Sequence, residues 1–264
     1  MIQFMKPIVK NLFIAFIFIP IINVHGQIAL GPKAAFHYYK TAYSDQDDKA
    51  ELTSKFRLGY NIGIFAIAPL KDHYSLVAEF GFSRKGKKTK VKEAGYNNTS
   101  KYNFLESSLL LRRSFEAHFI EGVPSTWFLN IGPNVQYWMG GKGKIDTRIP
   151  VDYKIQFGAN DGRAETTMFV ENVNRVLFGL DFGVGVNLQA GRAKSVTAEL
   201  RYTRGHTFLG DRDSDSINPD FINYQESLLT NYRIISLVFA YNFEFNYHDT
   251  KKGKSISDKV RKKR

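Results

Sequence analysis

The amino-acid sequence predicts an all-β fold, an eight-stranded antiparallel up-and-down β-barrel that crosses a membrane and carries an extended external hairpin. Three observations predict it: long segments alternate apolar and polar residues, the polar face is narrow, and the connections alternate between short and long. In residues 176–189 one face is apolar throughout, and the other holds Gly, Asp, Asn and Gln with a single Leu. This pattern suits a barrel in lipid, because its outside contacts hydrocarbon and its narrow interior is polar.

Eight segments share this period of two, which is the period of a β-strand. They are longer than the five or six residues usual for strands of soluble proteins. Trp and Tyr residues tend to fall near the segment ends, where membrane barrels carry aromatic girdles. The expected strands are residues 28–39, 55–68, 74–85, 102–114, 127–140, 176–189, 196–208 and 232–247.

The connections between these segments predict the orientation of the barrel. The links 69–73 and 190–195 are short and the link 115–126 is intermediate. The other four links are long, so long links alternate with shorter ones along the chain. Outer-membrane barrels have short periplasmic turns and long external loops. We therefore expect both ends of the barrel chain to face the periplasm.

The longest loop, residues 141–175, contains alternating segments of its own. Val151, Tyr153, Ile155 and Phe157 alternate with polar residues up to the turn signal Asn160-Asp161-Gly162, and residues 166–170 alternate on the way back. Two such runs around an Asn-Asp-Gly turn predict a β-hairpin that projects beyond the membrane.

The ends of the 264-residue chain are expected to lie outside the barrel domain, residues 27–247. Lys6 and Lys10 precede the apolar run 12–22, and small residues follow it, as in a cleaved signal peptide over residues 1–26. An exported chain does not meet the chromosome, so its net charge of +12 does not indicate nucleic acid as a partner. The chain has no Cys, which excludes disulfides, thiolate metal sites and cysteine nucleophiles.

The excess positive charge is concentrated in the leader and in two other segments. A basic external patch at the end of the third segment and in the long link 86–101 after it is expected to contact outer-membrane lipid and lipopolysaccharide phosphates. Its residues are Arg84, Lys85, Lys87, Lys88, Lys90 and Lys92. Residues 248–264 are expected to form a disordered tail that binds a periplasmic protein or peptidoglycan, or that only solubilises the chain. The tail's cations are Lys251, Lys252, Lys254, Lys259, Arg261, Lys262, Lys263 and Arg264.

The inward-facing positions of the predicted strands include charged residues of both signs. Because the interior of an eight-stranded barrel is filled by its own side chains, these charges must pair with one another. The pairing favours a salt-bridged plug over an ion or proton path. The predicted interior residues are Arg57, Glu79, Glu106, Arg112, Asp181, Glu199, Arg201 and Glu244.

Two other candidate sites follow the seventh segment. His206 precedes Asp211 and Ser214, residue types that a lipid A-modifying enzyme would use, but no motif marks Ser214 as a nucleophile. The segment 211–215 is similar to the start of a calcium loop, but Ser216 and Ile222 occupy the positions that require Gly and Glu. We therefore expect a non-enzymatic protein without cofactor or metal and interpret this segment as a solvated acidic loop.

The order of several soft motifs resembles a known family. These motifs are LGPKAAFHY, FLESSLLLRRSF, FLNIGPNVQYWMGG, LFGLDFGVGVNLQ, ELRYTRGHTFL and IISLVFAYNFEF. In this order they resemble the PorT-like small outer-membrane β-barrels of Bacteroidota, which are related in architecture to OmpA and OmpX. The resemblance implies an eight-stranded barrel of a Gram-negative outer membrane with a structural or interaction role. The opening motif of the secretion-system PorT subunit is missing, so that subunit's role is not carried over.

Overall fold

The computed structural model describes residues 28–44, 46–92, 97–146, 150–158, 167–170, 173–191, 193–210 and 228–245, and nearly all of them are in strands. The predicted leader (1–26) and basic tail (248–264) lie outside these residues. The elements in chain order are β1 Ile28–Tyr43, α2 Gln46–Glu51, β2 Leu52–Lys55, β3 Arg57–Lys71, β4 Tyr74–Val91, β5 Asn97–Ile120, β6 Val123–Asp146, β7 Val151–Phe157, β8 Thr167–Val170, β9 Val176–Gly191, β10 Lys194–Gly205 and β11 Thr230–Phe245.

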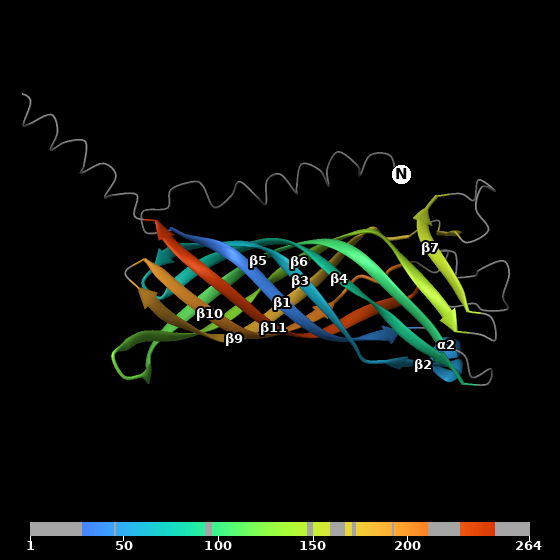
Figure 1. The fold of residues 1–264 in the computed structure, drawn as a ribbon, viewed down its shortest axis with the longest axis horizontal. Coiled ribbons are helices and arrows are strands. Elements are labelled where there is room, and N and C mark those ends of the chain that lie inside the picture. The colour runs from blue at the N-terminus through green and yellow to red at the C-terminus, as the bar shows by residue number, and fades with distance from the viewer. Residues whose placement is uncertain are drawn as a thin grey trace, which may run out of the picture.

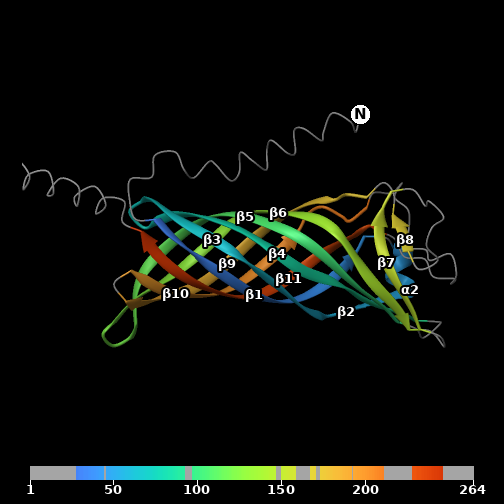
Figure 2. The ribbon, with the colours of Figure 1, turned by 45° about the horizontal axis from the view of Figure 1, so that its top comes forward.

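Eight of these strands close into an antiparallel barrel (Figures 1 and 2). The order around the ring is β1, β3, β4, β5, β6, β9, β10 and β11, and β11 pairs with β1 in register from Ile28↔Phe245 to Tyr43↔Thr230. Each of these strands overlaps one of the eight segments expected from the sequence. The predicted fold class is confirmed.

The two ends of the barrel differ as the link lengths predicted. The start of β1, the end of β11, the turns 72–73 and 121–122, and the adjoining ends of β9 and β10 lie at one end (Figure 1). Asp72 and Gly122 adopt positive φ values of 50° and 75°, which tight turns require. Helix α2 and strands β2, β7 and β8 lie at the opposite end, which we call the external end (Figures 1 and 2).

At the external end β4, β5 and β6 continue well past the predicted strand ends. β4 pairs with β5 as far as Lys90↔Asn97, and β5 pairs with β6 as far as Asn97↔Asp146. β2 adds to the edge of β4, and β7 adds antiparallel to β6. We call this extension, made of residues 84–91 of β4, 97–103 of β5, 140–146 of β6 and strands β2, β7 and β8, the external sheet.

The extended external hairpin is present, but β6 and β7 form it. The sequence predicted instead that residues 151–157 pair antiparallel with residues 166–170. That pairing is wrong: β8 runs parallel to β7, with Lys154 opposite Thr167 and Phe157 opposite Val170. The free edge of the prolonged β6 is close to β7 along the chain, so β7 folds back onto β6. The predicted Asn160-Asp161-Gly162 turn lies outside the described residues.

A β-bulge marks the point where β6 leaves the barrel. Asn103 pairs with Gly140 and Phe104 pairs with Trp138, so Met139 is an extra residue. Gly140 has φ +135°, a conformation that residues other than Gly rarely adopt. Up to Tyr137, β6 pairs with β9, and from Gly141 it pairs with β7. The bulge redirects the strand from the barrel into the external sheet.

The outside of the barrel is apolar. Along β11 the residues alternate between buried and exposed, and the exposed ones include Ile235, Leu237 and Phe239. A soluble monomer rarely exposes such a continuous apolar surface, whereas a barrel in lipid must do so. No helix among the described residues is long and apolar enough to cross a membrane.

Candidate functional site

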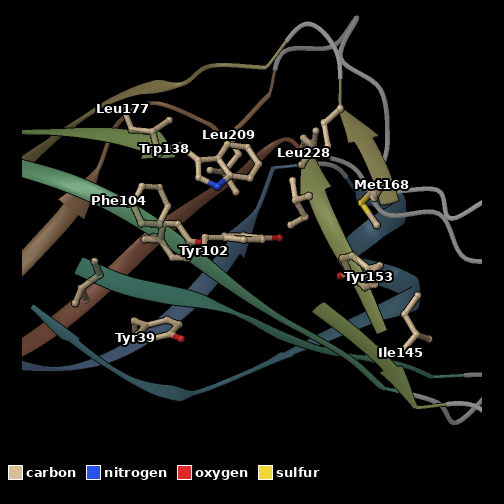
Figure 3. Packing of buried hydrophobic residues seen from close by; sticks show 14 residues of the cluster. Tyr39, Tyr102, Phe104, Trp138, Ile145, Tyr153, Met168, Leu177, Leu209 and Leu228 are labelled. Carbon is tan, nitrogen blue, oxygen red and sulfur yellow. The ribbon is translucent and has the colours of Figure 1, made fainter. Parts of the chain in front are cut away.

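Aromatic and aliphatic side chains fill the external end of the lumen (Figure 3). Trp138 is fully buried, with its ring centroid 5.1 Å from Tyr102 and 4.9 Å from Phe157 of β7. Because β7 and β8 contribute side chains to this cluster, the external sheet covers the mouth of the barrel. We call the cluster the aromatic plug, and its buried members are Tyr39, Tyr102, Phe104, Trp138, Ile145, Tyr153, Ile155, Met168, Val170, Leu177, Leu209, Leu228, Tyr232 and Ile234.

Tyr153 fixes β7 over the plug. A Cβ atom added to Gly143 would lie 2.1 Å from Cζ of Tyr153, so the tyrosine ring lies directly against the β6 backbone. The Tyr153 hydroxyl donates a hydrogen bond to Oδ1 of Asn98 (2.8 Å) and lies 2.8 Å from Oγ of Ser100. The sheet strands and their buried polar side chains therefore hold the plug in place.

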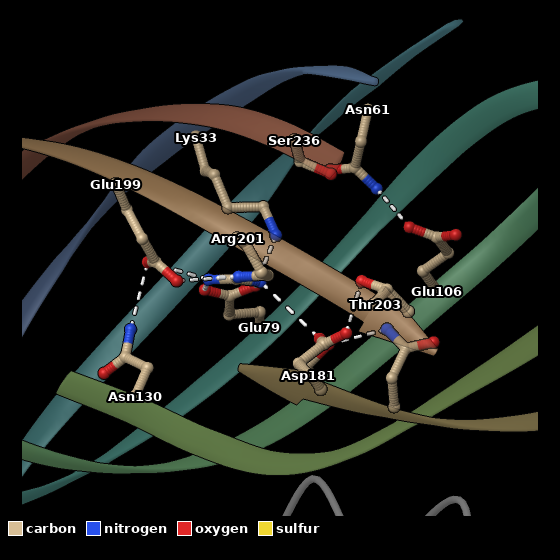
Figure 4. A network of polar contacts seen from close by, with 12 residues as sticks. Lys33, Asn61, Glu79, Glu106, Asn130, Asp181, Glu199, Arg201, Thr203 and Ser236 are labelled. Atoms are coloured by element: carbon tan, nitrogen blue, oxygen red, sulfur yellow. Dashed lines mark hydrogen bonds and ion pairs between the residues drawn. The ribbon is translucent and has the colours of Figure 1, made fainter. Parts of the chain in front are cut away.

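Arg201 on β10 lies at the centre of a polar network in the middle of the lumen (Figure 4). Its Nη1 and Nη2 donate to both carboxylate oxygens of Glu79 at 2.6 and 2.7 Å. Its Nε and Nη2 donate to the two oxygens of Glu199 at 2.8 and 2.9 Å. Two bidentate pairs on one guanidinium form a strong, directional contact. Lys33 of β1 also donates to Glu79.

Asp181 and Arg112 extend this network around the barrel wall. Asp181 accepts hydrogen bonds from Thr203 (2.6 Å) and Ser108 (3.0 Å), and lies 3.7 Å from Nη1 of Arg201. Asn130 accepts from Nε of Arg112 and donates to Glu199, each at 3.0 Å. The Arg112 guanidinium lies 3.8 Å from the centroid of the Phe128 ring. Each of these charges therefore has a polar or aromatic partner, as burial requires.

A second ion pair connects the network to the plug. Lys85 donates to Glu106 and to Oε1 of Gln136 (2.9 Å), and Glu106 also accepts from Asn61 (2.9 Å). The Lys85 ammonium lies 5.1 Å from the Phe104 ring of the plug. Four cations thus face four carboxylates in the centre of the lumen, namely Lys33, Lys85, Arg112 and Arg201 against Glu79, Glu106, Asp181 and Glu199.

The network leaves little open space. The cavity between Lys33, His37, Glu79, Glu106, Asp181 and Arg201 is about 20 Å³. That volume holds about one water molecule. A dissolved substrate therefore does not fit between these network residues.

Six of the eight predicted interior residues are buried and joined in this network. The other two, Arg57 and Glu244, also occupy inward positions but lie half-buried near opposite ends of the barrel. In the part of the chain that the structure describes, neither Arg57 nor Glu244 is joined to the central network by a hydrogen bond or an ion pair. The six network members are Glu79, Glu106, Arg112, Asp181, Glu199 and Arg201.

The predicted basic external patch is divided between the two faces of β4. Lys85 and Lys87 are each 1% exposed and point into the barrel, so their assignment to an external surface is wrong. The reason is that β4 continues to Val91, and alternate residues of a strand face opposite sides. The outward positions hold Arg84, Lys88 and Lys90, and Lys92 is exposed just beyond the strand.

Lys33 and His37 are interior residues that were not among the predicted ones. Both lie on β1, and Nδ1 of His37 is 2.7 Å from Oγ of Ser236 in the network region. Phe36 and Tyr38 are apolar and point outward, and alternate residues of a strand face opposite sides. Lys33 and His37 are therefore on the inward face. The signal that could have identified them is this alternation with apolar residues along the first segment.

The alternative enzymatic site is only partly described. His206 is exposed just after β10, and its backbone nitrogen donates to the carbonyl of Phe178 at 2.9 Å. Asp211 and Ser214 lie outside the described residues, as does the whole calcium-like segment. Among the residues that are described, no group of three or more His, Asp or Glu side chains could hold a metal ion.

The fold is similar to small outer-membrane barrels of known structure. OprG from Pseudomonas aeruginosa is 8% identical, with a TM-score of 0.45 over 84% of this chain and 96% of OprG. Neisserial surface protein A is 13% identical, with a TM-score of 0.38 over 82% of this chain and 99% of that protein. Ail of Yersinia pestis, solved with the heparin analogue sucrose octasulfate, is 9% identical, with a TM-score of 0.36 over 83% of this chain and 99% of Ail.

No curated protein sequence matches the chain. A family model described as an outer membrane protein beta-barrel domain matches residues 22–207, well over half of the sequence. This match agrees with the closed ring of strands and with the apolar outer surface. The chain therefore belongs to the family of outer membrane protein β-barrel domains, as an integral protein of the outer membrane.

Proposed function

We propose that this protein is a non-enzymatic outer-membrane barrel that displays the external sheet to the cell's surroundings. The observation that carries this proposal is the closed lumen. The aromatic plug and the balanced network around Arg201 leave a cavity of about 20 Å³, enough for about one water molecule. A barrel closed in this way supports its outer strands rather than a transport path, and it offers no internal cleft to a substrate.

The rest of the topology follows from the same proposal. The short turns face the periplasm, a cleaved leader at residues 1–26 directs export, and the basic tail at 248–264 contacts a periplasmic protein or peptidoglycan. The positions of the six motifs on the barrel strands β1, β5, β6, β9, β10 and β11 support a place among PorT-like barrels of Bacteroidota. Comparing crosslinked partners of the full chain and of a chain ending at residue 247 tests the tail. Identical sets of partners would contradict the tethering role.

The outward face of the external sheet supports an anionic partner. Lys101 of β5 lies opposite Lys142 of β6, which lies opposite Lys154 of β7, and all three side chains are exposed. On β4 the same face carries Arg84, Lys88 and Lys90. Like charges placed directly opposite one another destabilise a sheet, and bound phosphate groups relieve this repulsion. The proposed partner is therefore lipopolysaccharide, through its phosphates.

This interaction is tested by replacing the three facing lysines with Gln and measuring binding of the purified barrel to immobilised lipopolysaccharide. We expect binding of the unaltered protein to weaken with salt, and the triple variant to bind about tenfold less tightly. Lys71→Gln at the opposite end of β3 serves as the control and should leave binding unchanged. Equal binding by the triple variant and the unaltered protein would contradict an interactive role for this face.

A further inference from the structure

Three cations lie side by side on the outer wall of the barrel, on strands that do not belong to the external sheet. In the register of the strands, Arg204 of β10 is opposite Arg233 of β11, and Arg233 is opposite Lys40 of β1. All three side chains are exposed. They lie at the external ends of their strands, and we call them the cation row.

The cation row is electrostatically unfavourable on its own. Neighbouring strands are about 4.8 Å apart, so the three side chains begin within about 10 Å of one another. The ion pairs found among the described side chains do not include these three cations, and no Asp or Glu occupies an outward position of β1, β10 or β11 in the described part. In the described part of the chain, the Lys40 ammonium lies over the Phe56 ring, with Nζ 5.5 Å from the ring centroid. Directly opposed like charges destabilise the sheet.

The surface directly below the row is apolar. The next outward row consists of Tyr38, Ile235 and Tyr202 in the same register. The row after it consists of Phe36, Leu237 and Leu200, which are 63%, 45% and 54% exposed. Three cations thus lie at the external border of a lipid-facing apolar column. A ligand that fits both parts has an anionic headgroup joined to hydrocarbon chains.

We propose that the cation row binds the phosphates of lipid A, the membrane anchor of lipopolysaccharide, in the outer leaflet. Two guanidiniums can each donate two parallel hydrogen bonds to phosphate oxygens, and the Lys40 ammonium adds a third positive charge. The acyl chains lie along the apolar column of β1, β10 and β11. The inference rests on the proposed membrane orientation, but it shares no residue with the lysines of the external sheet.

The phosphate chemistry is tested by native mass spectrometry of the full chain released from detergent micelles. The probes are lipid A with two phosphates, the same lipid after enzymatic dephosphorylation, and phosphatidylethanolamine. We expect the unaltered protein to retain diphosphorylated lipid A in preference to the other two. The variant Lys40→Gln/Arg204→Gln/Arg233→Gln should bind it at least tenfold less tightly, because each lost charge-assisted contact is worth about tenfold. Equal retention of the dephosphorylated lipid would overturn the proposal.

Lys194→Gln is the matched control, because Lys194 is an exposed outward cation at the opposite end of β10. It should retain lipid A like the unaltered protein. Folding of the triple variant is checked by the mobility of unheated protein in a detergent gel. In lipid-free detergent its thermal midpoint should equal or exceed that of the unaltered protein, because repulsion is removed.

A separate arm distinguishes a lipid site from a simple anion site. Lipid A should raise the thermal midpoint of the unaltered protein more than that of the triple variant, and inorganic phosphate at equal phosphate concentration should raise neither. If free phosphate stabilises the unaltered protein as much as lipid A does, the row is an ion site and the proposal is wrong. Loss of binding at the external sheet in the earlier test would leave this result unaffected, so the two proposals can fail separately.

Discussion

Arg201 illustrates how single residues set the stability of the interior. It pairs with Glu79 and Glu199 through four hydrogen bonds, and its side chain is buried. Removing one partner of a buried pair leaves the other charge without compensation, which costs about 3–5 kcal/mol. The two carboxylates also come from different strands, so the arginine contributes both to charge balance and to strand placement.

We therefore expect Arg201→Met to lower the free energy of unfolding by about 3–5 kcal/mol, measured by urea unfolding in lipid vesicles. The triple variant Arg201→Met/Glu79→Gln/Glu199→Gln should recover part of this loss, since no unpaired charge remains. Arg113→Gln is the control, because Arg113 is an exposed outward arginine near the end of β5 that is opposite the external sheet. A loss below about 1 kcal/mol in Arg201→Met would show that the network is not structural.

The close packing of Gly143 against Tyr153 leads to a second prediction about a single residue. A methyl group there would overlap the Tyr153 ring, with only 2.1 Å to Cζ. We expect Gly143→Ala to loosen β7 and to lower stability by about 1–3 kcal/mol. A protease should then cleave the external sheet faster in limited proteolysis. Gly191→Ala, where an added Cβ atom meets nothing within 4 Å, should leave both measurements unchanged.

At the scale of elements, the parallel pairing of β7 and β8 can be tested by crosslinking. The chain has no Cys, so introduced pairs report without background. Phe157→Cys/Val170→Cys should form a disulfide under mild oxidation, because these residues are opposite each other in the parallel register. Val151→Cys/Val170→Cys should not, because Val151 lies six residues away along β7, about 20 Å. An antiparallel hairpin would give the reverse result.

The barrel strands could be predicted from the sequence because each one has a lipid side and a lumen side. In residues 176–189 those two sides differ in every pair of positions except the first, Val176 and Leu177, so the strand is easily recognised. Beyond the membrane this contrast disappears. From Arg84 to Lys92 both faces of β4 carry cations, so the end of the strand and the inward position of Lys85 could not be recognised.

The partners within the lumen could be predicted only as a set. The sequence indicated that Glu79 and Arg201 both face inward, but they are 122 residues apart and meet only because of the register around the ring. The direction of β8 was unpredictable for a similar reason. A short strand pairs with whichever edge is free, and the free edge depends on where β6 leaves the barrel.

For the whole molecule, the closed lumen predicts that the barrel does not conduct ions. Purified barrels inserted in planar bilayers should show no discrete conductance steps, because plug and network leave space for only about one water. A porin incorporated in parallel serves as the positive control. Regular steps that disappear on heat denaturation would contradict the closed interior and favour a narrow channel.

The alternative that this protein is a lipid A-modifying enzyme is tested by analysing lipid A from whole cells. Cells that produce the unaltered protein or the His206→Ala variant should contain lipid A of identical mass, because a non-enzymatic barrel leaves lipid A unmodified. A modification that is present with the unaltered protein and lost in the variant would establish catalysis and overturn the proposed structural role.

The network around Glu79 has a consequence for how the barrel assembles. Its cations come from β1 and β10, and β11 lies between those strands, where the first and last strands of the ring join. Before that seam closes, the carboxylate on β4 cannot reach both cations. A half-assembled sheet in the bilayer would therefore hold an incompletely neutralised carboxylate, which is costly in hydrocarbon. Ring closure and charge neutralisation are thus coupled events, and partly inserted intermediates are selectively disfavoured.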